Sequence, residues 1–207
     1  MSGFFYYLLT FAEAATSVFG LRFAYEQPHY AVLQDLGENV EIRRYEPSLA
    51  IEATVDGTDR DKAMSEAFTL LFRYITGANR QDRKIAMTAP VQTDSERIAM
   101  TTPVQTSSEQ GTLRMRFFLP QAVAAAGAPA PLDPRLHLIE MPPMTIAALR
   151  YSGVATQVAR DHEAATLFGA LARSAWRPDG AVLQLSYDPP FTIPFLRRNE
   201  TAVRVVR

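Results

Sequence analysis

Two methionines occupy the same position in a ten-residue segment that occurs twice in the chain. The first copy, KIAMTAPVQT, starts at Lys84, and the second, RIAMTTPVQT, starts at Arg97. A thioether is flexible and polarizable, suits a flat aromatic ligand, and can coordinate haem iron. Met87 and Met100 are therefore candidate ligand residues, although packing in a hydrophobic core is the commoner role of methionine.

Each copy of this segment is expected to form a β-strand. Side chains alternate between the two faces of a strand, so each methionine would share a face with the other apolar residues of its copy. A hairpin through the connecting TDSE would bring Met87 and Met100 onto one surface. Pro90 and Pro103 cannot donate to a sheet ladder, which predicts that both strands lie at an edge or carry bulges.

Catalytic residues do not form a recognisable pattern. The chain has no cysteine, which excludes thiolate catalysis, disulfides and cysteine-bound metal clusters. Its three histidines, His29, His137 and His162, lack the paired spacing of a zinc site. Ser152 lies in a predicted strand-to-helix turn without a GxSxG elbow, and His162 fits the solvated face of a helix better than the role of a base. The sequence therefore favours a protein that is not an enzyme.

The composition is that of a globular protein. Of 207 residues, 47% are hydrophobic and 21% are charged, which allows a sizeable core in one large or two small domains. The 22 acidic and 21 basic residues nearly balance, and no run of Lys or Arg is long enough to follow a phosphate backbone. Nucleic acid is therefore not expected as a partner.

The N-terminal segment FFYYLLTFAEAATSVFGLRF, residues 4–23, is mostly apolar and would be about 30 Å long as a helix. Glu13 near its centre would cost a spanning helix about 2.5–3.5 kcal/mol, and a signal peptide would need a cationic start. We expect residues 1–24 to form an apolar, amphipathic helix that lies on a membrane, a membrane protein or the domain itself. A membrane span and a cleaved signal are the alternatives. A cytoplasmic or membrane-associated location is expected over export.

Beyond residue 25 the hydrophobic pattern predicts short strands. YAVLQDL and NVEIRRY flank Gly37-Glu38, and apolar residues alternate with polar ones in the second segment, which favours a β-hairpin. LAIEATV, residues 49–55, predicts a third strand.

A helix follows the third strand. Asp59 or Asp61 can cap its start, and Gly77 ends it. Its expected apolar stripe recurs at steps of three and four residues and consists of Ala63, Ala67, Phe68, Leu71, Phe72 and Ile75.

The second half of the chain repeats this plan at an offset of 96 residues. Leu71-Phe72 recurs as Leu167-Phe168, and Pro143 and Gly153 repeat the spacing of Pro47 and Gly57. The predicted elements are a strand through MTIAALRYS, a helix over about 157–174 with Ala164, Leu167, Phe168, Leu171 and Ala175 on one stripe, and strands at 181–187 and 201–206. This pattern predicts an internal duplication of two strand-helix-strand-strand halves whose sheets join.

An Ala- and Pro-rich segment, residues 121–134, connects the two halves and has room for one short helical turn. Neither half is expected to bury both faces of its sheet alone. Residues 25–207 are therefore predicted to form one domain.

Five segments together resemble the SOUL haem-binding protein family over residues 25–207. They are VEIRRYEP, A..FTLLFRYITGANR, the doubled IAMTAPV, RFFLP and YDPPFTIPFLRRNE. The resemblance implies an α+β fold, a distorted antiparallel β-barrel flanked by two helices. That fold is built by duplication and is similar to bacterial effector-binding domains.

The resemblance also implies non-enzymatic binding of haem or a related tetrapyrrole, mainly by apolar contact, for transport, buffering or delivery. Haem-binding members place the ligand against the first helix of the domain and the loop before the last strand. Carried over by motif, the helix positions are Ser65, Phe68, Phe72 and Arg73, and the loop positions are Phe191, Phe195, Arg197 and Arg198. The two loop arginines could hold propionates, or they could satisfy loop carbonyls and pair with Asp188 or Glu200.

Two positions depart from the family pattern. Ser65 stands where some binders carry arginine, and a hydroxyl cannot form an ion pair with a propionate. Arg44 stands where one branch has been proposed to use a histidine as axial ligand, and a charged guanidinium is no iron ligand. The remaining candidates for iron ligation are His29, Met87, Met100 and a tyrosine such as Tyr74.

Two other functions stay open at this point. The chain could be a membrane-associated interaction or adaptor protein, tethered by residues 4–23, with an effector-binding-like fold and no obligatory haem. It could also be a small-molecule hydrolase, because some effector-binding relatives hydrolyse small molecules with buried glutamates.

Overall fold

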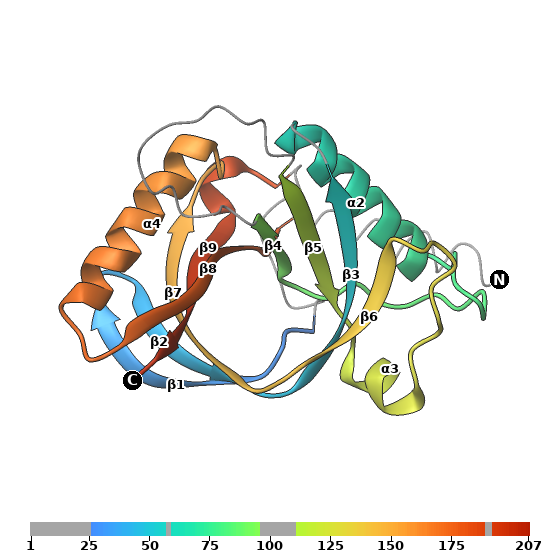
Figure 1. Cartoon of the computed structure of the whole chain (residues 1–207), viewed down its shortest axis with the longest axis horizontal. Coiled ribbons are helices and arrows are strands. Elements are labelled where there is room, and N and C mark those ends of the chain that lie inside the picture. The colour runs from blue at the N-terminus through green and yellow to red at the C-terminus, as the bar shows by residue number, and fades with distance from the viewer. Residues whose placement is uncertain (1–25, 57–58, 96–110, 189–191) are drawn as a thin grey trace.

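A computed structural model describes residues 26–56, 59–95, 111–188 and 192–207 of the chain. In these residues nine strands form one sheet in the order β1-β2-β7-β9-β8-β4-β5-β3-β6, with every neighbouring pair antiparallel. The sheet curls into a half-barrel with α2 over one half and α4 over the other (Figure 1). The predicted α+β class and barrel-like antiparallel fold are therefore confirmed.

The elements follow one another in a simple order. The strands are β1 (Tyr30–Gly37), β2 (Val40–Tyr45), β3 (Ser48–Asp56), β4 (Val91–Ser95), β5 (Thr112–Phe118), β6 (Leu136–Met141), β7 (Met144–Ser152), β8 (Arg177–Ser186) and β9 (Arg198–Val206). The helices are α2 (Arg60–Ile75), α3 (Gln121–Ala126), α4 (Gln157–Ala172) and the short 3₁₀ turn η1 (Pro194–Leu196). The helix α3 is the short helical turn anticipated in the connector.

The hairpin of β1 and β2 turns where the sequence predicts it. Gly37, Glu38 and Asn39 all have positive φ, and the Asp35 carboxylate accepts a hydrogen bond from the Gly37 N–H at 2.8 Å. Gly, Asn and short acidic side chains are the residues that favour such a turn.

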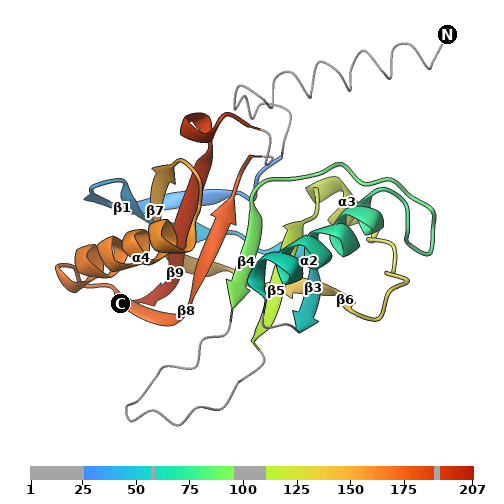
Figure 2. The same ribbon diagram turned by 90° about the horizontal axis from the view of Figure 1, so that it is seen from above.

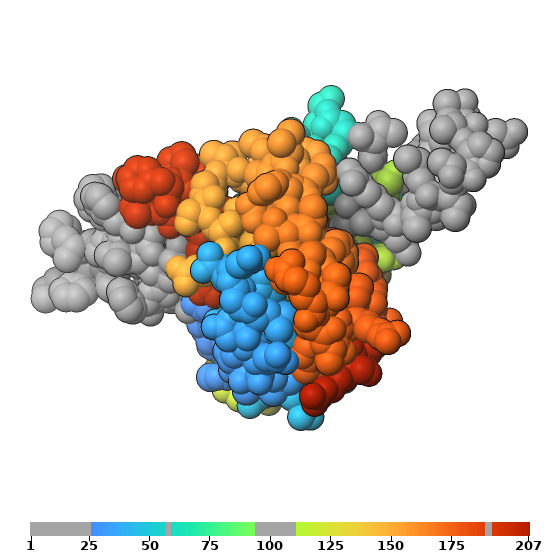
Figure 3. Space-filling model, turned by 90° about the vertical axis from the view of Figure 1, so that its left-hand side faces the viewer, coloured from blue at the N-terminus to red at the C-terminus, as the bar shows by residue number. Residues whose placement is uncertain are grey.

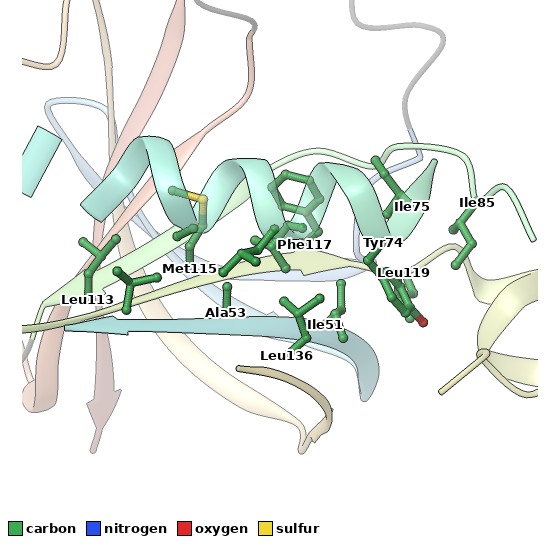
Figure 4. Packing of buried hydrophobic residues seen from close by; sticks show 14 of the residues in the cluster. Ile51, Ala53, Tyr74, Ile75, Ile85, Leu113, Met115, Phe117, Leu119 and Leu136 are labelled. Atoms are coloured by element: carbon green, nitrogen blue, oxygen red, sulfur yellow. The ribbon is translucent and has the colours of Figure 1, made fainter. Parts of the chain in front are cut away.

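Helix α2 begins at the predicted cap. The Asp59 carboxylate accepts hydrogen bonds from the Asp61 and Lys62 N–H groups at 3.1 and 3.2 Å, so Asp59 rather than Asp61 is the cap. Its buried face packs on β3 and β5 (Figure 4) and consists of Ala63, Ala67, Leu70, Leu71, Tyr74 and Ile75.

The predicted stripe of α2 was wrong at two positions. Phe68 and Phe72 are exposed, while Leu70 and Tyr74 are buried. Apolar residues cover more than half of the helix circumference here, so periodicity alone does not identify the side that meets the sheet.

Helix α4 packs on β7, β8 and β9 in the same way, with Leu167, Ala170 and Leu171 buried. The Thr156 hydroxyl caps it by accepting from the Ala159 N–H. Phe168, predicted to face the sheet, is 38% exposed, and the helix ends at Ala172 rather than at 174. Beside α4, β1 and the segment before β8 lie side by side (Figure 3), and the Trp176 indole N–H donates to the Gln34 side chain.

The two halves of the sheet share one topology. β3-α2-β4-β5 and β7-α4-β8-β9 have the same order of elements, and each half places its third strand between the other two. β3 and β7 start and end 96 residues apart. The halves join where β4 pairs with β8. That the two halves arose by duplication stays a prediction.

The repeated segment departs from its prediction. Residues 84–90 of the first copy form no strand, and β4 begins only at Val91, directly after Pro90. β4 is also an inner strand, paired with β5 on one side and β8 on the other, so the predicted edge position was wrong. Proline has no N–H to donate, and the ladder accordingly starts after it. The second copy, with Met100 and Pro103, lies outside the described residues.

The predicted N-terminal helix and the domain boundary after residue 24 also lie outside the described residues. Among the residues that the structure describes, none of the helices has both the length and the apolar character of a membrane span.

Candidate functional site

The outer face of α2 carries two exposed phenylalanines. Phe68 is 36% and Phe72 46% exposed, their ring centroids lie 6.0 Å apart, and their planes differ by 12°. The Phe68 ring also meets the buried Phe117 ring of β5 edge to face at 5.5 Å, which holds it in place. We call Phe68 and Phe72 the aromatic shelf.

Polar residues lie on the same face of α2. Ser65 and Arg73 are exposed, and Ser65, Phe68 and Phe72 recur at the spacing of one helix face. Arg73 forms no ion pair with any described residue, so its guanidinium is available to an anion. Nearby, Arg135 bonds Asp133 and Glu66 at 2.9 and 2.6 Å. Hydrogen bonds from Arg135 lower the pKa of Asp133 to about 2.

The loop residues carried over from the family lie elsewhere. Phe195, in η1, is 72% exposed. The Arg197 Nε donates to the Thr192 carbonyl at 2.8 Å, and the Arg198 guanidinium donates twice to Glu200 and lies 4.0 Å from the Tyr187 ring centroid. Phe191 lies outside the described residues.

The shelf and the loop belong to different halves of the sheet. α2 packs on β3 and β5, whereas η1 packs against β7, and β9, β8 and β4 stand between β7 and β5. Figures 1 and 2 both show η1 on the α4 half. The structure therefore brings together Ser65, Phe68, Phe72 and Arg73, and places Phe195, Arg197 and Arg198 apart from them.

The candidate iron ligands are dispersed. Met87 is half-buried and packs against the hydrophobic cluster under α2, and the buried Tyr74 hydroxyl donates to the Pro129 carbonyl. His29 is exposed just before β1, and Met100 is not described. Among the described residues, no three His, Asp or Glu side chains cluster in a way that could hold a metal ion.

A buried charge network on the other half was not predicted. Glu200 is fully buried and accepts hydrogen bonds from Arg43 and Tyr187, each at 2.7 Å, and from Arg198 at 2.6 Å. Burial alone would raise the pKa of Glu200, but the two guanidinium groups outweigh it and hold that pKa below its ordinary value. Burial and the charge of Glu200 raise the pKa of the Tyr187 hydroxyl well above its ordinary value.

This network joins β2, β9 and Tyr187, the residue after β8, and makes Glu200 a poor general base, because the carboxylate is ionised and already accepts hydrogen bonds from three side chains. The sequence held little signal for it, because Arg43 stands between Ile42 and Arg44, and Glu200 stands between the polar Asn199 and Thr201.

Comparison with known proteins decides the family. Residues 25–204 match the family model described as SOUL heme-binding protein. The chain belongs to the SOUL haem-binding protein family. This SOUL domain is 28% identical over 162 residues to human "Heme-binding protein 2", covering 77% of this chain and 73% of that protein. It is 29% identical over 150 residues to "Heme-binding protein 1" of Sus scrofa, covering 72% of this chain and 75% of that protein.

Solved structures share the fold of this SOUL domain at low identity. The EcmrR C-terminal domain matches with a TM-score of 0.59 and 8% identity, covering 81% of this chain and 97% of that one. A structure titled as a hydrolase from Listeria innocua matches with a TM-score of 0.52 and 11% identity, covering 82% and 92%. These likenesses extend to the fold alone.

Proposed function

We propose that the chain binds haem or a related tetrapyrrole on the outer face of α2, without catalysing a reaction, and serves as a carrier, buffer or delivery protein. The observation that carries this proposal is the aromatic shelf: two exposed, nearly parallel phenylalanine rings on one helix face. Membership of the SOUL family and the names of the relatives support the choice of ligand.

The chemistry of the shelf suits a flat amphipathic molecule. Burying exposed aromatic carbon under a tetrapyrrole would contribute about 25 cal/mol per Å² removed from water. Arg73, one residue beyond Phe72, could pair with a propionate by charge-assisted hydrogen bonds. Ser65 could offer only a neutral hydrogen bond.

The loop residues lie on the other half of the sheet from the shelf. Contact of Phe191, Phe195, Arg197 and Arg198 with the same ligand stays a prediction, and it would require the loop to approach α2. Arg198 would also have to leave Glu200, which it neutralises in a buried setting. Phe195 is therefore the loop residue that could join a ligand at the lowest cost.

Iron coordination is not required by this arrangement. Met87 and Tyr74 pack inward, and we propose that apolar contact, rather than an axial bond, supplies most of the affinity. Metal-free protoporphyrin IX should then bind with an affinity close to that of haemin.

The test is an absorption titration of the full chain with haemin and with protoporphyrin IX at micromolar concentration. Phe72→Ala should weaken both by about tenfold, on the apolar area it removes. Phe168→Ala on α4 is the matched control, because that ring is 38% exposed on the other helix. A titration that never saturates, or an equal loss in both variants, would contradict the proposal.

A further inference from the structure

The two most exposed large apolar side chains among the described residues belong to the α4 half of the molecule. Val158, in the first turn of α4, is 80% exposed, and Phe195, in η1, is 72% exposed. Val154, between β7 and α4, is 52% exposed. Scattered apolar side chains are ordinary on a protein surface, whereas a group of them marks an interaction site. What matters is therefore whether these three lie together.

The pairing of β7 with β9 brings them to one corner of the fold. Ser152, the last residue of β7, pairs with Arg198, the first residue of β9, and η1 packs against β7. Val154 follows this pair and η1 precedes it, so the two segments start side by side. Figure 3 shows η1 (red) standing out from the surface beside the residues that lead into α4 (light orange). We call Val154, Val158 and η1 the apolar tip.

The apolar tip has the shape and composition of a membrane anchor. Within η1, Pro194 and Phe195 are exposed, so an apolar turn projects into water. The sequence has no acidic residue between Asp188 and Glu200. Aromatic and aliphatic side chains of this kind become buried at the boundary between lipid headgroups and acyl chains. A fluid bilayer can close around a projecting turn, whereas a protein partner would need a matching pocket.

The start of the described chain lies on the same side of the molecule. The Glu26 carbonyl accepts the Ala89 N–H at 3.1 Å, and Ala89 belongs to the same hydrophobic cluster as Tyr187. The Tyr187 N–H in turn donates to the Arg198 carbonyl at 3.2 Å, directly after η1. Figure 2 shows the blue start of the described chain and the dark red η1 along one side. Residues 4–23, which precede Glu26, contain only two charged side chains, and an apolar segment of that length would hold this side of the domain against a membrane.

We propose that the apolar tip docks on a lipid bilayer, to which residues 4–23 bring the domain. The tip lies on the α4 half and the aromatic shelf on the α2 half, so this inference does not rest on the proposed haem function. Phe195 is named in both proposals. Val158 takes no part in the haem proposal, and the test therefore depends on Val158.

A fluorescent label at Val158 tests the docking. The chain has no cysteine, so Val158→Cys gives a single site for a nitrobenzoxadiazole label, and Leu132→Cys, at a position 61% exposed before β6, is the matched control. When phosphatidylcholine vesicles are added to the full chain, the label at Val158 should brighten at least about twofold and shift to the blue, because it enters an apolar medium. The label at Leu132 should not change.

Two results with these labels would overturn the proposal. If the chain sediments with the vesicles while the label at Val158 stays unchanged, residues 4–23 hold the chain alone and the tip does not dock. If the label at Val158 is already blue-shifted before vesicles are added, residues 4–23 or a second copy of the chain cover the tip.

Aspartate substitutions measure the contribution of the tip. Val158→Asp should weaken sedimentation with the vesicles by about tenfold, because a carboxylate would have to enter the bilayer interface, and Leu132→Asp should leave it unchanged. An acid in the first turn of α4 suits the helix dipole, so the fold should be kept, which far-UV circular dichroism verifies. Haemin should bind Val158→Asp as it binds the wild type, so each proposal can fail without the other. Equal vesicle binding by Val158→Asp and Leu132→Asp would contradict the docking.

Discussion

Arg43 on β2 reaches across β7 to Glu200 on β9, and the two side chains meet in a buried ion pair of 2.7 Å. The Arg43 side chain is 3% exposed, and that of Glu200 is fully buried. The pair ties three neighbouring strands together on the face opposite α4. Removing Glu200 leaves the buried Arg43 guanidinium with only the part-exposed Glu41 as a partner, which is more costly than losing a surface pair.

Glu200→Ala should therefore destabilise the fold by about 3–5 kcal/mol, because Arg198 loses its ion-pair partner Glu200 and the buried Arg43 keeps only its pair with the part-exposed Glu41. Urea unfolding followed by circular dichroism measures the loss. Glu38→Ala, which breaks the exposed pair with Arg173, is the control and should cost at most about 1 kcal/mol. Similar losses in the two variants would show that the buried network contributes little.

Acid should weaken the same network. The pKa of Glu200 lies below its ordinary 4.5 in the folded protein, so its contribution is complete above about pH 4.5 and is lost as the pH falls through the folded value. The difference in unfolding free energy between wild type and Glu200→Gln should shrink from pH 6 to pH 3. Urea titrations at several pH values check this, and a difference that stays constant with pH would contradict it.

Ser65→Arg should strengthen haemin binding. The new guanidinium would stand on the same helix face as Phe68, Phe72 and Arg73 and could pair with a second propionate, a gain of about 1 kcal/mol or roughly fivefold in affinity. Ser65→Gln is the control, since it adds length without charge. If both variants bind haemin as the wild type does, the propionates do not face this end of the shelf.

Asp59→Ala should destabilise the fold, since its carboxylate accepts two N–H groups at the start of α2. Asp61→Ala should cost less, about 0.3–0.5 kcal/mol, because Asp61 acts only on the helix dipole. Thermal unfolding of the two variants distinguishes them. A larger loss in Asp61→Ala would reverse the assignment of the cap.

Much of the fold could be predicted because its signals are local. The turn at Gly37, the helix start at Asp59 or Asp61 and the alternation along β2 each depend on residues within a few positions of one another. The offset of 96 residues is found by comparing the two halves of the sequence with each other. The family resemblance rested on short motifs, and the family model that matches residues 25–204 confirmed it.

The candidate site was harder to predict, because periodicity tells which residues share a face and not which face meets the core. Phe68 and Phe72 were expected to pack inward with Leu71, and the sheet instead covers Leu70, Leu71 and Tyr74. Similarly, the prolines predicted an edge position or a bulge for the repeated segment, whereas β4 starts after Pro90 and lies inside the sheet.

The sequence by itself determined the turn at Gly37, the two main helices, the family, and the absence of cysteine chemistry. Only the tertiary structure decided the exposure of the aromatic shelf, the pairing of Arg43 with a residue 157 positions away, and the position of the apolar tip at one corner of the fold. The physical reason is distance along the chain. Local propensities act over a few residues, whereas burial and charge pairing depend on which strands the curled sheet brings together.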